Sequence, residues 1–170
     1  MKRLIIGAFC HILTLALYIG CSGEKAVEIG DRVRVAYRGT TEDGVHFDST
    51  NTGDYIEFVV GQGQVIPGFD RSVVGMVPGE NKLVVLSSDE AYGPYRPEYT
   101  HQVPASEFPD TIAPVIGLEL DMGQPDGKTV RIQVTDIQDD TLVTLDANHP
   151  LAGKSLNFDL TLVEIMPSEE

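Results

Sequence analysis

Residues 64–76 read Gln-Val-Ile-Pro-Gly-Phe-Asp-Arg-Ser-Val-Val-Gly-Met, and the rest of the chain is predicted to fold around them. Phe69, Val73 and Met76 recur at helical spacing, so they lie on one face of a helix of about two turns. Pro67 suits the first turn of this helix, because its missing N–H removes no hydrogen bond there. A helix this short is not stable alone. We therefore expect it to pack on the strands that flank it.

Strands are predicted on both sides of this helix, because apolar and polar residues alternate there with a period of two. In the first of them, Val33, Val35 and Tyr37 alternate with arginine residues. The segment 82–86 is apolar nearly throughout, which predicts a strand that is covered on both faces. The predicted strands of this part are 31–38, 45–49, 56–60, 82–86 and 156–162, with turns at 39–44 and 77–80.

The sequence between Pro94 and Asp146 differs from the rest in composition and in the pattern of its apolar residues. Residues 95–114 are rich in proline, so we expect loops, an extended segment and at most one helical turn there. Short apolar segments then predict three or four strands, at 115–122, 128–134 and 141–145. Together they form a compact β unit of about fifty residues, which would be marginally stable if isolated.

The composition limits the classes of partner. The chain has 170 residues, of which 12 are basic and 26 acidic, for a formal net charge of −14. The length suits one domain, or one domain that carries a smaller one. The negative charge argues against nucleic acid and against adsorption on anionic lipid head groups. The four histidines are scattered along the sequence, so we expect no metal site.

The first twenty residues differ from the rest of the chain. Lys2 and Arg3 precede an apolar run that is typical of a secretory signal and too short for a full membrane span. The run ends at Gly20-Cys21, which resembles a bacterial lipoprotein signal in which the cysteine becomes lipidated and N-terminal. Cys10 would leave with the signal, and lipid attachment explains an unpaired Cys21 outside the cytoplasm. An uncleaved N-terminal anchor and ordinary cleavage near Gly23 remain alternatives.

A series of short motifs runs through the chain. They are Val35-Ala-Tyr-Arg-Gly39, Glu42-Asp-Gly44, Phe47-Asp48, Gly61, Val65-Ile-Pro-Gly-Phe69, Gly75 and Ala91-Tyr-Gly93. In this order and at this spacing, the set resembles FKBP-type peptidyl-prolyl isomerases. Asp146-Ala-Asn-His-Pro-Leu-Ala-Gly153, followed by Leu156-Asn-Phe158, resembles the SlyD-like branch of that family. That branch carries a small β domain, called insert-in-flap, in the loop before the last strand.

The resemblance, which covers about residues 27–165, implies an α+β fold. An antiparallel half-barrel sheet would surround one short helix, with a small all-β domain inserted near the end. The implied organisation is a lipoprotein-like signal at 1–20, a linker at 21–26, an isomerase domain at 27–94 and 147–166, and an insert-in-flap chaperone domain at 95–146. The histidine- and cysteine-rich tail with which some SlyD proteins bind nickel has no counterpart after His149.

The resemblance also implies a pocket for a prolyl peptide. Its catalytic residues would be Tyr37, Asp48, Phe69, Tyr92 and Phe158, and its substrate-binding residues Phe47, Ile56, Phe58, Val65 and Ile66. Phe69 would form the floor under the proline ring. The Ile66 N–H and the Tyr92 hydroxyl would donate hydrogen bonds to substrate carbonyls, and Asp48 would hold Tyr37 and polarise the pocket.

Alternative structural roles are open for several of these side chains. Asp48 precedes Ser49 and Thr50 and would serve equally as the cap of a turn. Tyr37, Phe58 and Phe158 lie on alternating strands and would belong to the core of any such sheet. His149, beside Pro150, is interpreted as a residue that fixes a loop, and His46 as an exposed strand residue.

The implied reaction needs neither a nucleophile nor a cofactor. Amide resonance creates a rotation barrier of about 18–20 kcal/mol, and a dry apolar pocket favours the twisted, less dipolar amide. The expected protein is a monomeric isomerase that acts on X–Pro bonds of unfolded or partly folded polypeptides. It would be anchored in the bacterial cell envelope through lipid on Cys21, facing the periplasm or the exterior.

The predicted insert adds a second expected activity. Apolar side chains such as Val103, Phe108, Ile112 and Val115 would hold unfolded clients by hydrophobic contact or by strand addition. A different class of function is also compatible with the sequence, namely a non-catalytic holdase or surface binding module on the same fold.

Overall fold

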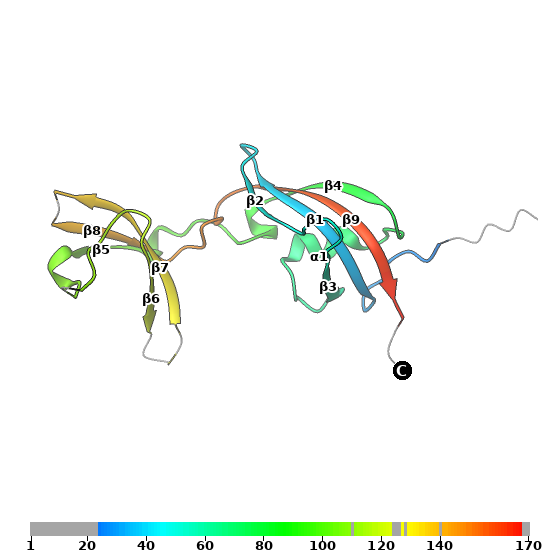
Figure 1. Ribbon diagram of the computed structural model, residues 1–170, viewed down its shortest axis with the longest axis horizontal. Helices are drawn as coiled ribbons and strands as arrows, with labels where there is room; N and C mark the ends of the chain where they lie inside the picture. Colours follow the sequence, from blue (N-terminus) through cyan, green and yellow to red (C-terminus); the bar gives the residue numbers. More distant parts are fainter. Residues whose placement is uncertain (1–23, 110, 124–126, 128, 140, 168–170) are drawn as a thin grey trace, which may run out of the picture.

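The computed structural model describes residues 24–109, 111–123, 127, 129–139 and 141–167, which form two antiparallel sheets. Figure 1 shows the sheets next to each other along the long axis of the molecule. The five-stranded sheet consists of β1 (Arg32–Thr41), β2 (His46–Ser49), β3 (Ile56–Val59), β4 (Asn81–Leu86) and β9 (Leu156–Met166). The four-stranded sheet consists of β5 (Thr100–Pro104), β6 (Glu119–Gly123), β7 (Thr129–Gln138) and β8 (Leu142–Asp146).

The pairing of β1 with β9 is the centre of the larger sheet. The two strands are antiparallel from Arg32 opposite Met166 to Thr41 opposite Leu156, with one bulge after Arg34. β4 pairs with the other side of β9, while β2 and β3 pair with the two ends of β1. The strand order is therefore β2-β1-β9-β4, with β3 beside β1.

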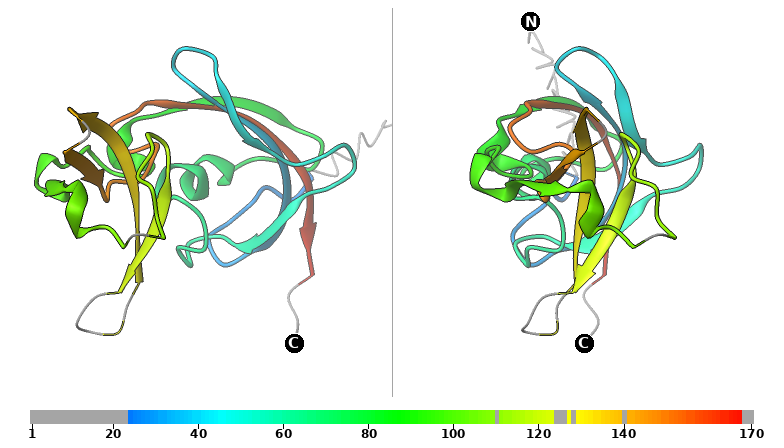
Figure 2. Two further views of the ribbon diagram at one scale, coloured as in Figure 1. Left: turned by 60° about the vertical axis from the view of Figure 1, so that its left-hand side comes forward. Right: turned by 90° about the vertical axis from the view of Figure 1, so that its left-hand side faces the viewer.

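One α-helix is present in the described part of the chain, and the larger sheet curves around it (Figure 2). This helix, α1 (Pro67–Val73), has a proline in its first turn, as predicted. Phe69 and Val73 are buried, and so is Met76 just after the helix. They join the inward side chains of the sheet in one core, whose other buried members are Val27, Val33, Val35, Phe58, Val60, Leu86, Leu156, Phe158, Leu160 and Leu162. The predicted α+β architecture is confirmed.

The polar residue Asp70 fastens the loop before the helix. Its carboxylate is buried and accepts the N–H of Gly61 at 2.9 and 3.0 Å. The carbonyl of Ile66, at the helix start, accepts the N–H of Asp70 at 3.1 Å. Because buried charge is costly unless it is hydrogen-bonded, this contact fixes both the loop and the first turn of the helix.

The prediction that residues 82–86 are covered on both faces is wrong. Leu83 and Val85 are 81% and 72% exposed. β4 is the edge strand of its sheet, and its inner face alone meets the core, where Leu86 is buried and Val84 packs against it. Apolar residues on both faces of a strand therefore did not indicate a second covering layer.

Three smaller predictions also need correction. Gly39 to Thr41 continue β1 rather than forming a turn, because this part of the strand pairs with β2 on one side and β9 on the other. Residues 115–118 form a turn, closed by the Leu118 N–H on the Val115 carbonyl, and not the start of a strand. Residues 95–114 contain two 3-10 turns instead of at most one, η2 (Pro97–Tyr99) and η3 (Ala105–Glu107). A further 3-10 turn, η1 (Ser88–Glu90), lies before them.

The smaller sheet is attached by two chain segments that are bonded to each other. The Asn148 side chain accepts the N–H of Arg96 at 2.9 Å and donates to the Arg96 carbonyl at 2.9 Å. The Tyr95 hydroxyl donates to Asp146 at 3.0 Å, and the Gly153 N–H donates to the Gly93 carbonyl at 2.8 Å. We call these residues, 93, 95, 96, 146, 148 and 153, the crossing.

The smaller sheet has its own core of Ile132, Val134 and Val143. This agrees with a separate inserted unit, although the domain boundaries at 94/95 and 146/147 stay predictions. The predicted signal at 1–20 and Cys21 lie outside the described residues. In the described ranges, no helix has the length and apolar character that crossing a membrane requires.

Candidate active site

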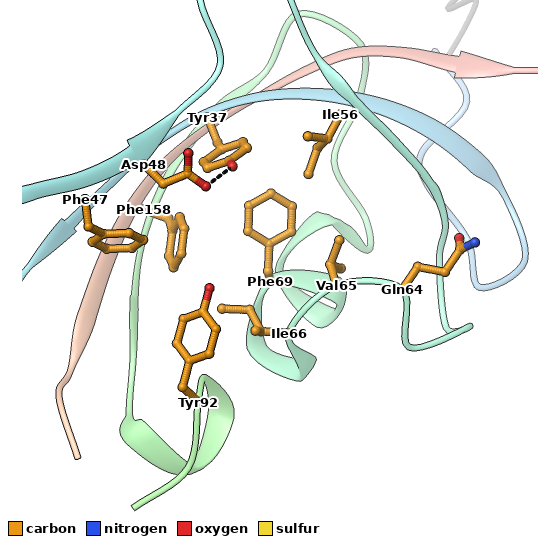
Figure 3. Close-up of a pocket in the computed structure, with 10 residues that line it drawn as sticks. All are labelled: Tyr37, Phe47, Asp48, Ile56, Gln64, Val65, Ile66, Phe69, Tyr92 and Phe158. Atoms are coloured by element: carbon orange, nitrogen blue, oxygen red, sulfur yellow. Dashed lines mark hydrogen bonds between the residues drawn. The ribbon is translucent and has the colours of Figure 1, made fainter. Parts of the chain in front are cut away.

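A cavity of about 380 Å³ lies between α1 and the curved sheet (Figure 3). It falls at the lower end of the size range of small-molecule pockets. Strands β1, β2, β3 and β9, the start of α1 and the segment after η1 all contribute side chains. The lining residues are Tyr37, Phe47, Asp48, Ile56, Gln64, Val65, Ile66, Phe69, Tyr92 and Phe158.

The Phe69 ring forms the base of this cavity and is only 3% exposed. Phe158 meets it edge to face, with ring centroids 5.4 Å apart and planes at 87°. Tyr37 meets it in the same way at 5.5 Å and 85°. Such edge-to-face contacts are the favoured geometry of aromatic pairs and hold each ring in a defined orientation. The floor is therefore apolar and rigid.

The register of the sheet brings the remaining wall together at Gly39. This residue lies opposite Phe158 in β9 and opposite Asp48 in β2. A Cβ atom at position 39 would be 2.6 Å from Cζ of Phe47 and 3.1 Å from Phe158. Phe47 and Phe158 meet edge to face at 5.7 Å directly over this gap. Only glycine leaves room for both rings.

Two tyrosines bring hydroxyl groups to the cavity. The Tyr37 hydroxyl donates to Oδ2 of Asp48 at 2.5 Å. Burial and this hydrogen bond to Asp48 raise the pKa of Tyr37, and burial together with the charge of Asp48 raises the pKa of Tyr92. Both tyrosines are therefore protonated at neutral pH and act as hydrogen-bond donors, not as bases. The geometry suits electrostatic stabilisation rather than proton transfer.

Two further hydrogen-bond donors lie in the site. Among the described residues, the N–H of Ile66 and the hydroxyl of Tyr92 have no hydrogen-bond acceptor. Figure 3 shows the Tyr92 hydroxyl pointing into the cavity, toward the aromatic cluster. Both groups can donate to the carbonyls of a bound peptide, which is the role that the resemblance to the isomerase family implies for them.

Nine of the ten predicted site residues line the cavity, and Phe58 does not. Phe58 is buried behind Phe69, with ring centroids 5.9 Å apart, so it supports the floor from below. Gln64 lines the cavity and was not predicted, although it directly precedes Val65 in the segment 64–76. Its side-chain oxygen accepts the Val59 N–H at 2.7 Å, which fixes the rim.

Asp48 and the histidines of the described chain take different structural roles. Within the described chain, the Asp48 carboxylate bonds Tyr37 and caps no turn. His149 fixes its loop by accepting the Leu151 N–H on Nδ1 at 3.1 Å, and it also stacks on Tyr92. His46 is exposed. No cluster of three or more potential metal ligands occurs in the described residues.

The family model for FKBP-type peptidyl-prolyl cis-trans isomerases matches residues 23–163. The chain belongs to this family. Among curated relatives, it is 31% identical over 130 residues to the FKBP-type isomerase SlyD of Treponema pallidum, covering 76% of this chain and 73% of that protein. It is 30% identical over 138 residues to SlyD of Escherichia coli strain K12, covering 81% of this chain and 69% of that protein.

Family membership establishes the activity of the chain as peptidyl-prolyl cis-trans isomerisation of the SlyD kind. Its substrates are accordingly proline-containing polypeptides. This agrees with a site that has an apolar floor and hydrogen-bond donors, since rotation about an amide bond breaks no covalent bond. The catalytic and substrate-binding roles of individual residues remain predictions, which the geometry makes specific.

Replacement of Gly39 by alanine tests the packing of this FKBP-type site. Because the new Cβ would overlap Phe47 and press on Phe158, we expect overpacking to lower the free energy of unfolding by about 1–3 kcal/mol. We expect kcat/KM for a prolyl peptide to fall about tenfold, since each 1.36 kcal/mol of transition-state stabilisation is one decade. Gly123→Ala is the control, because a Cβ there meets nothing within 4 Å. An unchanged rate in Gly39→Ala would contradict this account of the wall.

Proposed function

We propose that this isomerase acts on X–Pro bonds of unfolded or partly folded proteins outside the cytoplasm, and that its smaller sheet holds those clients. The observation that carries the proposal is the joint geometry of the cavity. The buried Phe69 ring lies beneath it, and the free donors of Ile66 and Tyr92 lie at its rim. A proline ring can rest on Phe69 while the flanking carbonyls accept these hydrogen bonds.

Catalysis in such a cavity is selective binding of the twisted amide. Rotation removes the conjugation between nitrogen and carbonyl, so the amide becomes less dipolar and loses less on leaving water. The Phe69, Phe158 and Tyr37 rings exclude water from one side of the bond. The Asp48 carboxylate orients the Tyr37 hydroxyl and places a negative charge at the rim, where it polarises the substrate amide.

Substitutions at the rim test the roles of the two polar residues. We expect Tyr92→Phe to lower kcat/KM about three- to tenfold, the worth of one net hydrogen bond of about 0.5–1.5 kcal/mol. Asp48→Ala should cost more, because it also frees Tyr37. The measurement is a protease-free isomerisation assay on a short prolyl peptide. Tyr55→Phe removes an exposed hydroxyl outside the cavity and is the matched control. Full activity in both rim variants would reject these assignments.

The turn that leads into β6 of the smaller sheet offers apolar side chains to a client. Val115 and Ile116 are 57% and 67% exposed. Of the residues named from the sequence, Val103, Phe108 and Ile112 are partly covered and only Val115 is exposed. β5 and β6 are the outer strands of the sheet, so their free edges can accept an extended segment by strand addition. Holding a client there would raise the concentration of its prolines near the cavity.

Client binding at this turn, beside the edge of β6, is tested with the double variant Val115→Ser and Ile116→Ser. We expect it to catalyse the refolding of a proline-limited protein about tenfold less efficiently, while its rate on a short peptide stays within twofold. Leu83→Ser with Val85→Ser is the matched control, since that pair is at least as exposed but lies on the larger sheet. Equal effects of the two double variants would show nonspecific hydrophobic binding rather than a client site.

The proposed location rests on the N-terminal sequence. Lys2 and Arg3, the apolar run and Gly20-Cys21 support secretion followed by lipid attachment to Cys21. A lipid anchor would keep the enzyme at the membrane surface, where newly exported chains arrive unfolded. After cleavage at Cys21 the chain keeps 10 basic and 26 acidic residues, and this net charge of −16 disfavours further adsorption to anionic head groups.

Mass spectrometry of the protein from membrane fractions tests this anchor. We expect an N-terminus at Cys21 that carries acyl chains, and release of the protein into the soluble fraction in Cys21→Ser. Cys10→Ser should leave the mature product unchanged, because that residue lies within the proposed signal. A mature protein that begins elsewhere and carries no lipid would refute the anchor.

A further inference from the structure

The Tyr92 ring is held differently from the other rings of the cavity. It lies flat on the imidazole of His149, with ring centroids 3.9 Å apart and planes at 3°. The rings of Tyr37, Phe47, Phe69 and Phe158 meet one another edge to face or tilted. His149 itself does not line the cavity. In the described chain, its aromatic contact with a lining residue is the stack on Tyr92.

The imidazole that supports Tyr92 is itself fixed. Its Nδ1 accepts the Leu151 N–H at 3.1 Å, which requires an unprotonated Nδ1 and leaves the proton of the neutral ring on Nε2. The His149 carbonyl accepts the Ala152 N–H at 2.8 Å. The preceding residue, Asn148, is bonded to Arg96 at the crossing. His149 thus lies in a turn that is held at both of its ends.

Tyr92 has no comparable anchor of its own. Its hydroxyl makes no hydrogen bond to the described residues, and 38% of the residue is exposed. The flanking N–H groups of Ala91 and Gly93 both bond to Ser88, which fixes the backbone but not the ring. The direction of the hydroxyl therefore depends on what the ring packs against, and the flat face of His149 is a major part of that surface.

We infer that His149 is a positioning residue, whose neutral imidazole holds Tyr92 with its hydroxyl aimed at the prolyl substrate. The inference rests on the proposed role of Tyr92 as a donor in the site. Protonation of Nδ1 would set an N–H against the Leu151 N–H and turn the ring out of its stack. The isomerase is then less active when His149 is charged.

The direction of the pH effect follows from the environment of His149. Although the residue remains partly exposed, burial of one face lowers the pKa of the imidazole from its ordinary value of 6.5. The neutral, supporting form therefore predominates above pH 6.5, and support is lost as the pH falls through the lowered pKa. Charged groups around it are Asp146 and Lys154 on one side, Glu119 and Arg131 on another, and Asp48 beyond Tyr92.

The test measures kcat/KM on a short prolyl peptide between pH 5 and pH 8, using the full chain. We expect His149→Ala to lose about three- to tenfold at pH 7.5, the range expected for one hydrogen bond. We expect His149→Phe, which keeps a flat ring but does not titrate, to stay within about twofold and to lack the decline below pH 6.5. His101→Ala, an exposed histidine on β5, is the control and should keep the profile of the parent protein.

A double-mutant cycle separates this inference from the proposed function. Because His149 acts through Tyr92, adding His149→Ala to Tyr92→Ala should cost less than twofold further. If Tyr92→Phe and Tyr92→Ala keep full activity, the proposed role of Tyr92 itself fails. If those variants lose activity while His149→Ala does not, or if His149→Phe retains the acid decline, the positioning role is overturned. Thermal unfolding of each variant shows that the comparison is made on folded protein.

Discussion

The antiparallel pairing of β1 with β9 is the constraint on which the molecule depends. It joins residues from the two ends of the described chain, and it sets Tyr37, Gly39 and Phe158 beside one another. This pair is curved, so the sheet wraps around α1. The Phe69 ring of α1 packs against the inner face of the sheet and forms the floor of the site. Contacts so distant in sequence form late and slowly during folding. This prolyl isomerase is thus built on a slow-folding type of topology.

Much of this arrangement could be predicted from the sequence, because local patterns encode it. Alternation in 31–38 and 156–162 gave two strands whose inward residues are the observed core. Pro67 marked the first turn of α1, and the spacing of Phe69, Val73 and Met76 gave its buried face. The site residues followed from a family resemblance, since nothing in the period of the strands tells a pocket residue from a core residue.

The features that could not be predicted depend on which elements become neighbours. Leu83 and Val85 have the composition of a covered strand, but exposure is decided by the strand order, which places β4 at an edge. Phe58 carries the right chemistry for the pocket, but it lies one layer beneath Phe69. The stack of His149 on Tyr92 joins residues on opposite sides of the insert, and no local pattern marks it.

The crossing has a consequence for how this chain tolerates change. Gly93 and Gly153 are bonded to each other, so the 59 residues between them leave the larger sheet and return to it at a single point. The geometry of β4 and β9 is then independent of what the intervening segment contains, as at sites where domain insertion succeeds. In evolutionary terms, the isomerase domain offers a fixed insertion point. Modules of different size and surface can be exchanged beyond the crossing, and the cavity keeps its shape as long as the turn that carries His149 is kept.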